Sequence, residues 1–147
     1  MVIEAKPFDE LSVEEIHDIF KLRSEIFVVE QDCVYQDIDG KDAKAVHVIG
    51  KKQGEIIAYT RVFKGGDYFK EASIGRVAVK KSERKYGYGK DIVQASILAI
   101  ESHFLETTIR ISAQLYLERF YHDFGFHQVG EGYLEDGIPH IAMLLNK

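Results

Sequence analysis

The amino-acid sequence predicts one α/β domain over residues 1–147, arranged as an α+β sandwich with a mixed sheet and helices on both faces. Three observations predict this fold class. β-like runs and helical stretches follow one another in the order β, α, β, β, β, α, β, α, β, β. No Pro/Ser/Gly-rich linker, low-complexity tract or internal repeat interrupts the order. The chain has 147 residues with 46% apolar content, enough to bury one core.

Composition narrows the classes of function. The formal net charge of −5 argues against general nucleic-acid binding, which needs a basic face. The single cysteine, Cys33, cannot form an internal disulfide, and the N-terminus lacks the pattern of a signal peptide. No apolar run approaches the ~20 residues of a membrane span. We therefore expect a cytoplasmic protein.

The first helix is predicted from a capping box. Ser12 followed by Glu15 is typical of a helix N-terminus, and apolar residues at helical spacing continue from Ile16 to Phe27. We expect this helix to end at about residue 28. Residues 30–45 are polar and acidic, which predicts a loop or irregular helix.

The middle of the chain predicts three strands and the longest helix. Val46–Gly50 and Glu55–Phe63 are β-rich and are joined by a short turn, which indicates a hairpin. Ser73–Val79 predicts the next strand. From about Gly89 to Phe104, apolar residues repeat at helical spacing.

The last third predicts a strand, a short helix and a final pair of strands. Thr108–Ala113 alternates as a buried strand, and Leu115–Phe124 predicts a helix. Phe126–Tyr133 and His140–Leu145 predict two strands that flank a turn at Glu135–Pro139.

The most informative segment is Arg84–Gly89, which reads R-x-x-G-x-G and lies between a strand and the long helix. The first turn of a helix has unpaired backbone N–H groups and partial positive charge, so it attracts phosphate. Gly87 and Gly89 permit positive φ or close approach of an anion. The spacing matches neither the P-loop nor the G-x-G-x-x-G dinucleotide motif.

This segment resembles the pyrophosphate-binding motif of the GNAT-superfamily N-acetyltransferases. Tyr121–Phe126 is similar to the Y-x-x-x-G-F of that superfamily, and the β-rich Ile74–Val79 stands directly before the loop. The resemblance covers nearly the whole chain. Phe27–Cys33 and Gly132–His140 further resemble the ElaA-type branch of the superfamily.

The resemblance implies a mostly antiparallel sheet whose fourth and fifth strands splay apart to admit acetyl-CoA as the acyl donor. Backbone N–H groups would hold the pyrophosphate, and the strand edge at Val77 and Val79 would pair with the pantetheine arm. A backbone N–H near Ala78 would polarise the thioester carbonyl. The implied cofactor-binding residues are Val77, Ala78, Val79, Arg84, Lys85, Tyr86, Gly87, Tyr88, Gly89, Lys90 and Gln114. Gln114 stands where many members have Asn, and no metal is expected.

The resemblance also implies that Tyr121 protonates the departing thiolate, with Tyr116 as the competing phenol. A phenol stays protonated at neutral pH and can donate. An amine acceptor needs a base, for which we name Glu30 first. The other candidates for the base are Glu131, Glu135, Asp136 and His140.

Charged residues on apolar patterns suggest an acceptor site or ion pairs. Arg23 lies inside the apolar stripe of the first helix, so it either pairs with one of Asp37, Asp39 and Asp42 or contacts a substrate. Arg61 and Arg76, on predicted strands, pose the same choice. We name Arg23, Arg76, Glu131 and His140 as candidate substrate-binding residues.

The predicted function is direct transfer of an acetyl group from acetyl-CoA to a primary amine of a small molecule or peptide. Two alternatives stay open: an acyltransferase like the acyl-homoserine-lactone synthases, which share the fold, and a non-catalytic acyl-CoA-binding module. We expect no nucleic-acid or membrane partner. A homodimer is plausible through the C-terminal strands around His140–Leu145.

Overall fold

The fold is built on one seven-stranded sheet. The computed structural model describes residues 1–146. The strands lie in the order β1-β2-β3-β4-β5-β7-β6, and every neighbouring pair is antiparallel except β4 and β5. Their bounds are β1 (Val2–Pro7), β2 (Val46–Lys52), β3 (Glu55–Phe63), β4 (Ala72–Val79), β5 (Ile109–Gln114), β6 (His127–Glu135) and β7 (Ile138–Leu145). The predicted mixed, mostly antiparallel sheet is confirmed.

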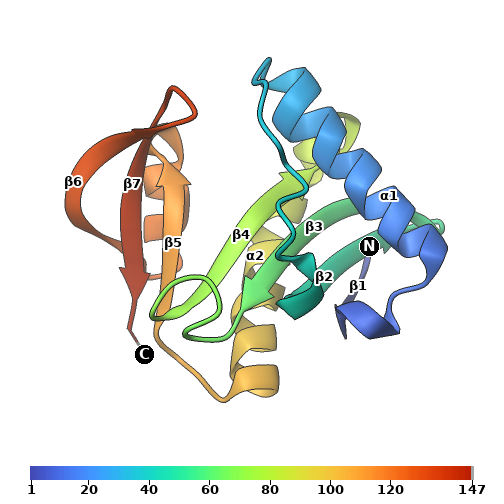
Figure 1. The fold of residues 1–147 in the computed structure, drawn as a ribbon, viewed down its shortest axis with the longest axis horizontal. Helices are drawn as coiled ribbons and strands as arrows, with labels where there is room; N and C mark the ends of the chain where they lie inside the picture. The colour runs from blue at the N-terminus through green and yellow to red at the C-terminus, as the bar shows by residue number, and fades with distance from the viewer. Residues whose placement is uncertain (147) are drawn as a thin grey trace.

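Helices cover both faces of the sheet, as predicted (Figure 1). α1 (Val13–Arg23) packs on one face, against β3 and β4. α2 (Tyr88–Phe104) crosses the other face behind β1–β4, and the short α3 (Glu118–His122) lies near β5 and β6. The sheet therefore has an apolar cluster on each side.

The first helix changes geometry before it ends. The Ser12–Glu15 capping box is present in both directions, as predicted. After Arg23 the chain continues as a π-helix, Ser24–Glu30, and not as an α-helix. The π-helical hydrogen-bond spacing continues beyond Glu30, because the N–H of Cys33 donates to the carbonyl of Val28, five residues earlier, at 3.1 Å. π-helical turns are rare and occur often at functional sites.

Both hairpins turn more tightly than predicted. The chain has positive φ at Gln53 (53°) and Gly54 (80°) between β2 and β3. It does so again at Asp136 (51°) and Gly137 (77°) between β6 and β7. Two consecutive residues with positive φ are typical of the type I′ turn, which matches the twist of paired strands. The predicted five-residue turn at Glu135–Pro139 is therefore wrong, because its outer residues belong to the strands.

Two further elements refine the predictions. The predicted helix at Leu115–Phe124 divides into a 3₁₀ turn, Leu115–Leu117, and α3.

β7 pairs with β5 on one side and β6 on the other, so both its edges are occupied. The edge strands of the sheet, which a second copy could pair with, are β1 and β6. Within residues 1–146, no helix is long and apolar enough to cross a membrane.

Glu15 ties the start of α1 to the sheet. Its carboxylate accepts from the Ser12 N–H at 2.9 Å and forms ion pairs with Lys51 (2.9 Å) and Lys6 (3.1 Å). Burial alone would raise the pKa of Glu15, but the hydrogen bonds from Ser12, Lys51 and Lys6 outweigh it and lower the pKa to about 2. The charged carboxylate therefore stabilises the folded state.

We predict that Glu15→Gln lowers the free energy of unfolding at pH 7 by about 1 to 2 kcal/mol. The contribution of a carboxylate with a lowered pKa is present above its unfolded value, here 4.5, and is lost as the pH falls toward 2. Urea unfolding at pH 7 and pH 3 should thus show a smaller difference at the acid pH. Glu14→Gln, an exposed neighbour in the same turn, is the control. A difference that does not depend on pH would contradict the assignment.

Candidate active site

The sheet opens between its fourth and fifth strands. The parallel pairing of β4 with β5 lasts only from Ala72↔Ile109 to Ser73↔Arg110. Beyond that point the two strands diverge (Figure 1), so the predicted splaying is confirmed. A cleft of about 490 Å³ lies there, lined by β4 on one side, β5 and β7 on the other, and the segment after α1 above.

A bulge in β4 shapes one wall of the cleft. β3 pairs Tyr59 with Ala78 and Arg61 with Gly75, so one residue of β3 faces two of β4, Arg76 and Val77. Arg76 has a φ of 52°, a left-handed conformation that costs a non-glycine residue about 1–3 kcal/mol. A bulge interrupts strand pairing and redirects the backbone. The three predicted cofactor-binding residues that follow, Val77, Ala78 and Val79, line the cleft.

The glycine-containing loop lies at one end of the cleft. A 3₁₀ turn, Lys81–Tyr86, leads to Gly87, whose φ of 76° places it in the left-handed region, and α2 begins at the next residue. A Cβ on Gly89 would meet only Phe120 and Val79, at 3.8 and 3.9 Å. Arg84 and Gly89 line the cleft, while the other predicted residues of the loop flank it: Lys85, Tyr86, Gly87, Tyr88 and Lys90.

Arg84 and Glu30 bind each other. Two guanidinium nitrogens of Arg84 contact the two carboxylate oxygens of Glu30 at 2.6 and 2.9 Å, and its Nε donates to the Val79 carbonyl at 2.9 Å. This bidentate pair links the end of the π-helix to the loop before α2. Both residues line the cleft, and the carboxylate of Glu30, which the sequence analysis names first as the base, is bound by a cation.

Tyr121 lies in the cleft on α3. Its side chain is 6% exposed, and its ring packs edge-on against Phe120 and Phe126. Burial, and secondarily the nearby Tyr116, raises the pKa of Tyr121, so the phenol is protonated at neutral pH. Tyr116 also lines the cleft but is 76% exposed. Both predicted acids therefore line the cleft, Tyr121 as a buried phenol and Tyr116 as an exposed one.

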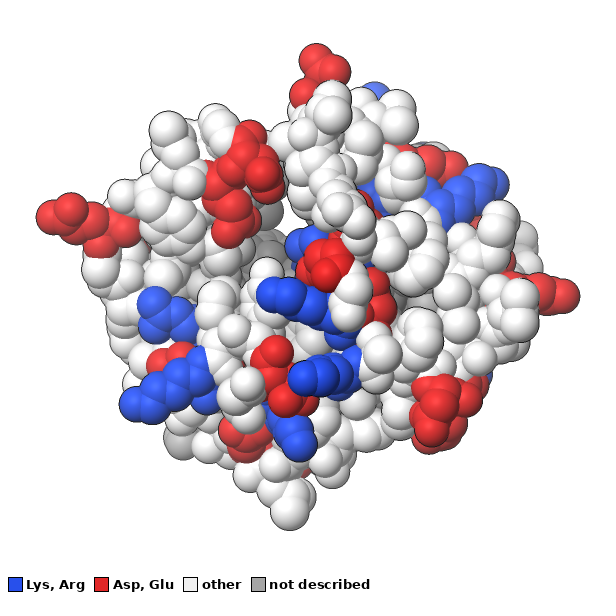
Figure 2. Space-filling model, viewed as in Figure 1, with Lys and Arg blue, Asp and Glu red and all other residues white. Residues whose placement is uncertain are grey.

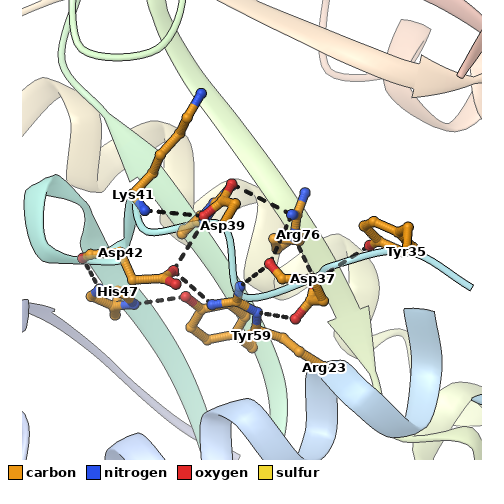
Figure 3. Close-up of polar contacts among 10 residues, drawn as sticks. Arg23, Tyr35, Asp37, Asp39, Lys41, Asp42, His47, Tyr59 and Arg76 are labelled. Carbon is orange, nitrogen blue, oxygen red and sulfur yellow. Dashed lines mark hydrogen bonds and ion pairs between the residues drawn. The ribbon is translucent and has the colours of Figure 1, made fainter. Parts of the chain in front are cut away.

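A buried ion network holds the segment between the π-helix and β2 on the sheet (Figure 3). The Arg23 side chain is fully buried and binds Asp37 through Nε (2.9 Å) and Asp42 through Nη1 (2.6 Å). It does not line the cleft. This placement favours the ion-pair alternative for Arg23 over contact with a substrate.

The network continues through the other two arginines to the cleft. Arg61 binds both oxygens of Asp39, at 2.6 and 2.9 Å, and reaches Asp42 at 3.0 Å. Burial alone would raise the pKa of Asp39, but hydrogen bonding to Arg61 and its charge outweigh burial and lower it well below its usual range. Arg76 pairs with Asp37 at 2.7 Å and lines the cleft. Figure 2 shows basic and acidic side chains gathered at the centre of this face, beside a hollow.

His47 is neutral beneath the network. The Asp42 carbonyl can only accept, so the Nε2 that lies 2.9 Å from it carries the hydrogen. The Nδ1 atom then accepts from the Tyr59 hydroxyl at 2.6 Å. Burial lowers the pKa of His47, which agrees with this assignment. The network therefore balances three arginines against three aspartates.

The wall opposite β4 carries polar residues of β5, β6 and β7. Gln114, Glu135, Asp136 and His140 line the cleft, as does Ser112. Of the four predicted substrate-binding residues, Arg76 and His140 line the cleft, and Arg23 and Glu131 do not. Sequence reasoning missed Tyr35 and Ser112. Ser112 could have been found, because it shares a strand face with Gln114 two residues away.

Nothing in the described part of the chain is arranged as a metal centre. Among residues 1–146, no group of three or more His, Cys, Asp or Glu side chains could hold a metal ion. The acidic side chains of Asp37, Asp39 and Asp42 bind arginines.

Comparison with known proteins identifies the family. The model of the acetyltransferase (GNAT) domain matches residues 9–147. The chain belongs to the GNAT acetyltransferase family. Protein ElaA of Escherichia coli (strain K12) is 40% identical over 136 residues, which cover 91% of this chain and 89% of that protein. The predicted superfamily, its ElaA-type branch and the acyltransferase class are thus confirmed.

Solved structures of GNAT proteins agree with the fold. The crystal structure of E. coli ElaA matches with a TM-score of 0.92 over 99% of both chains, at 37% identity. An acyl-CoA N-acyltransferase from Pseudomonas aeruginosa matches with a TM-score of 0.93 over 99% of both chains, at 35% identity. An aminoglycoside 6′-N-acetyltransferase solved with coenzyme A has a TM-score of 0.71 over 98% of this chain and 96% of its own, at 17% identity. That last likeness shows the fold alone.

We predict that Asp42→Asn lowers the free energy of unfolding by about 3 kcal/mol, because it removes the charge that Arg23 and Arg61 share in a buried site. Asp9→Asn, the same change at an exposed position, is the control and should have little effect. Chemical denaturation of both variants measures the difference. Equal losses would contradict a stabilising role of the network.

Proposed function

We propose that this GNAT protein transfers an acetyl group directly from acetyl-CoA to a primary amine. The observation that carries the proposal is the continuity of one cleft. Gly89 at the start of α2, the bulged end of β4 and the buried phenol of Tyr121 all line it. These are the places where the proposal needs a phosphate site, an open strand edge and a proton donor.

The donor would lie along β4. The first N–H groups of α2 point beyond the helix and are suited to a pyrophosphate, with Gly87 and Gly89 allowing close approach. β4 leaves its β5 side unpaired after Ser73. An amide-rich pantetheine arm could supply the missing hydrogen bonds as an added strand. Because Arg84 binds the Glu30 carboxylate and the Val79 carbonyl, we propose that its role is to stabilise the conformation of the loop.

The chemistry would occur where the bulge faces α3. A backbone N–H near Val77 or Ala78 would polarise the thioester carbonyl, and the amine would attack it without a covalent enzyme intermediate. Tyr121 would protonate the leaving thiolate. Its raised pKa keeps the proton on the phenol until a thiolate forms beside it.

The first prediction concerns the donor. We expect Gly89→Asp to weaken acetyl-CoA binding at least about tenfold, because it places a carboxylate where the pyrophosphate would bind. Isothermal titration calorimetry measures the affinity. The unfolding midpoint is the control, since a Cβ at this position meets only ordinary contacts. Unchanged affinity would mean that the glycine pair only forms a helix entry.

The second prediction concerns the acid. We expect Tyr121→Phe to lower kcat by about 10²–10⁴-fold while acetyl-CoA affinity is retained. Release of free thiol from acetyl-CoA with a panel of alkylamines, amino sugars and peptides measures turnover. Tyr116→Phe is the matched control for the competing phenol. Full activity of Tyr121→Phe would remove the assignment.

The same assay separates the alternatives. Binding of acetyl-CoA without turnover of any amine would favour a non-catalytic acyl-CoA-binding module. The R-x-x-G-x-G loop at Arg84–Gly89 speaks against the lactone-synthase alternative, because those enzymes usually take acyl carrier protein as the donor.

A further inference from the structure

A chain of hydrogen bonds crosses three strands on the wall opposite β4. Ser112 of β5 lies 2.5 Å from the Tyr133 hydroxyl of β6 and donates to Glu135 Oε1 at 3.3 Å. Glu135 Oε2 lies 3.4 Å from Nε2 of His140 on β7. The strand register explains this meeting, since β6 pairs Tyr133 directly with His140. The four side chains form one connected polar group.

The direction of each hydrogen bond can be assigned. Nδ1 of His140 lies 2.7 Å from the Ile138 carbonyl, which can only accept, so Nδ1 carries a hydrogen. Ser112 gives its hydrogen to Glu135 and therefore accepts the hydrogen of Tyr133. Donation thus runs from the tyrosine through the serine to the carboxylate.

This assignment leaves one position for a proton. Glu135 Oε2 and Nε2 of His140 face each other, and both are acceptors unless a proton lies between them. The pair can therefore take up one proton and release it again. Because Nδ1 is bound to the Ile138 carbonyl, Nε2 beside Glu135 is the atom of His140 that can take a proton.

Packing fixes the imidazole while leaving the carboxylate in contact with solvent. The His140 side chain is 8% exposed and its ring stacks on Tyr133, with centroids 6.2 Å apart. The Glu135 side chain is 51% exposed, which gives the proton an exit to water. His140 and Glu135 both line the cleft that contains Tyr121.

Several other ionisable groups of the cleft are already bound to a partner or protonated. Arg76 is a cation bound by Asp37, and Glu30 is held by Arg84. Asp136, next to Glu135 in the turn, adds negative charge that favours a cationic ligand at this end. Tyr35 is protonated, since burial, together with the charge of Asp37 and its hydrogen bond, raises its pKa to about 12.

We propose that His140, positioned by Glu135, is the base that takes a proton from the ammonium form of the acceptor amine. The proposal rests on the proposed acetyl transfer. The ammonium gives one proton to Nε2, which passes it through Glu135 to water. The freed nitrogen lone pair then forms the C–N bond, the C–S bond breaks, and the thiolate takes the Tyr121 proton. The second proton of the nitrogen restores Tyr121, so one proton is released per turnover.

The role implies a specific dependence on the amine. An alkylamine is an ammonium ion at neutral pH and needs the base, whereas an alkoxyamine of the same length is already unprotonated and does not. We expect His140→Gln to lower kcat/KM for alkylamines by about 10²–10⁴-fold and to leave alkoxyamines nearly unchanged. Glu135→Gln should give a smaller loss with the same selectivity.

The experiment measures thiol release from acetyl-CoA by the full chain with both amine series. His127→Gln, an exposed histidine on β6 outside the cleft, is the matched control and should affect neither series. Equal losses for both series, or no loss, would overturn the base while leaving acetyl transfer intact. A wild-type protein that binds acetyl-CoA and acetylates neither series, nor the wider amine panel, would overturn the proposed function and the base with it.

Discussion

The short parallel pairing of β4 with β5 is the constraint on which the rest of the structure depends. Two residue pairs hold the strands together at Ala72 and Ser73, and the strands then part. A sheet that opens within a fold leaves backbone N–H and C=O groups facing the gap, and such groups need partners. The cleft therefore has a strand edge as one wall, which favours an extended, amide-containing ligand over a compact one.

The bulge that shapes this edge is stabilised from outside the strand. Arg76 adopts an unfavourable positive φ, and its guanidinium is bound by Asp37 of the segment before β2. Arg23 holds the same aspartate from α1. Breaking a buried ion pair leaves an uncompensated charge, which is costly. The network thus keeps the backbone of β4 in its bulged form. It also holds the segment between the π-helix and β2 on the sheet.

Side chains far apart in the sequence meet at the cleft because of strand order. β7 inserts between β5 and β6, and this places His140 beside Glu135 and Ser112. The π-helix after α1 brings Glu30 to Arg84, fifty-four positions later. The two candidate bases therefore differ in their surroundings. Glu30 binds Arg84 in the loop before α2. His140 lies on the opposite wall of the cleft, where its Nε2 faces the Glu135 carboxylate.

The sequence by itself determined the element order, the capping box at Ser12, the glycine loop and the family, because these depend on periodicity and on residues close together in the chain. It also singled out Tyr121 and the cleft strand Val77–Val79 by resemblance. Only the tertiary structure decided the partners of the charged residues. Arg23, Arg76, Glu30 and His140 were all candidates for the acceptor side in sequence, since the sequence does not show which group each charged side chain faces. Burial and strand register separate them, because each pair forms between residues brought together only by folding.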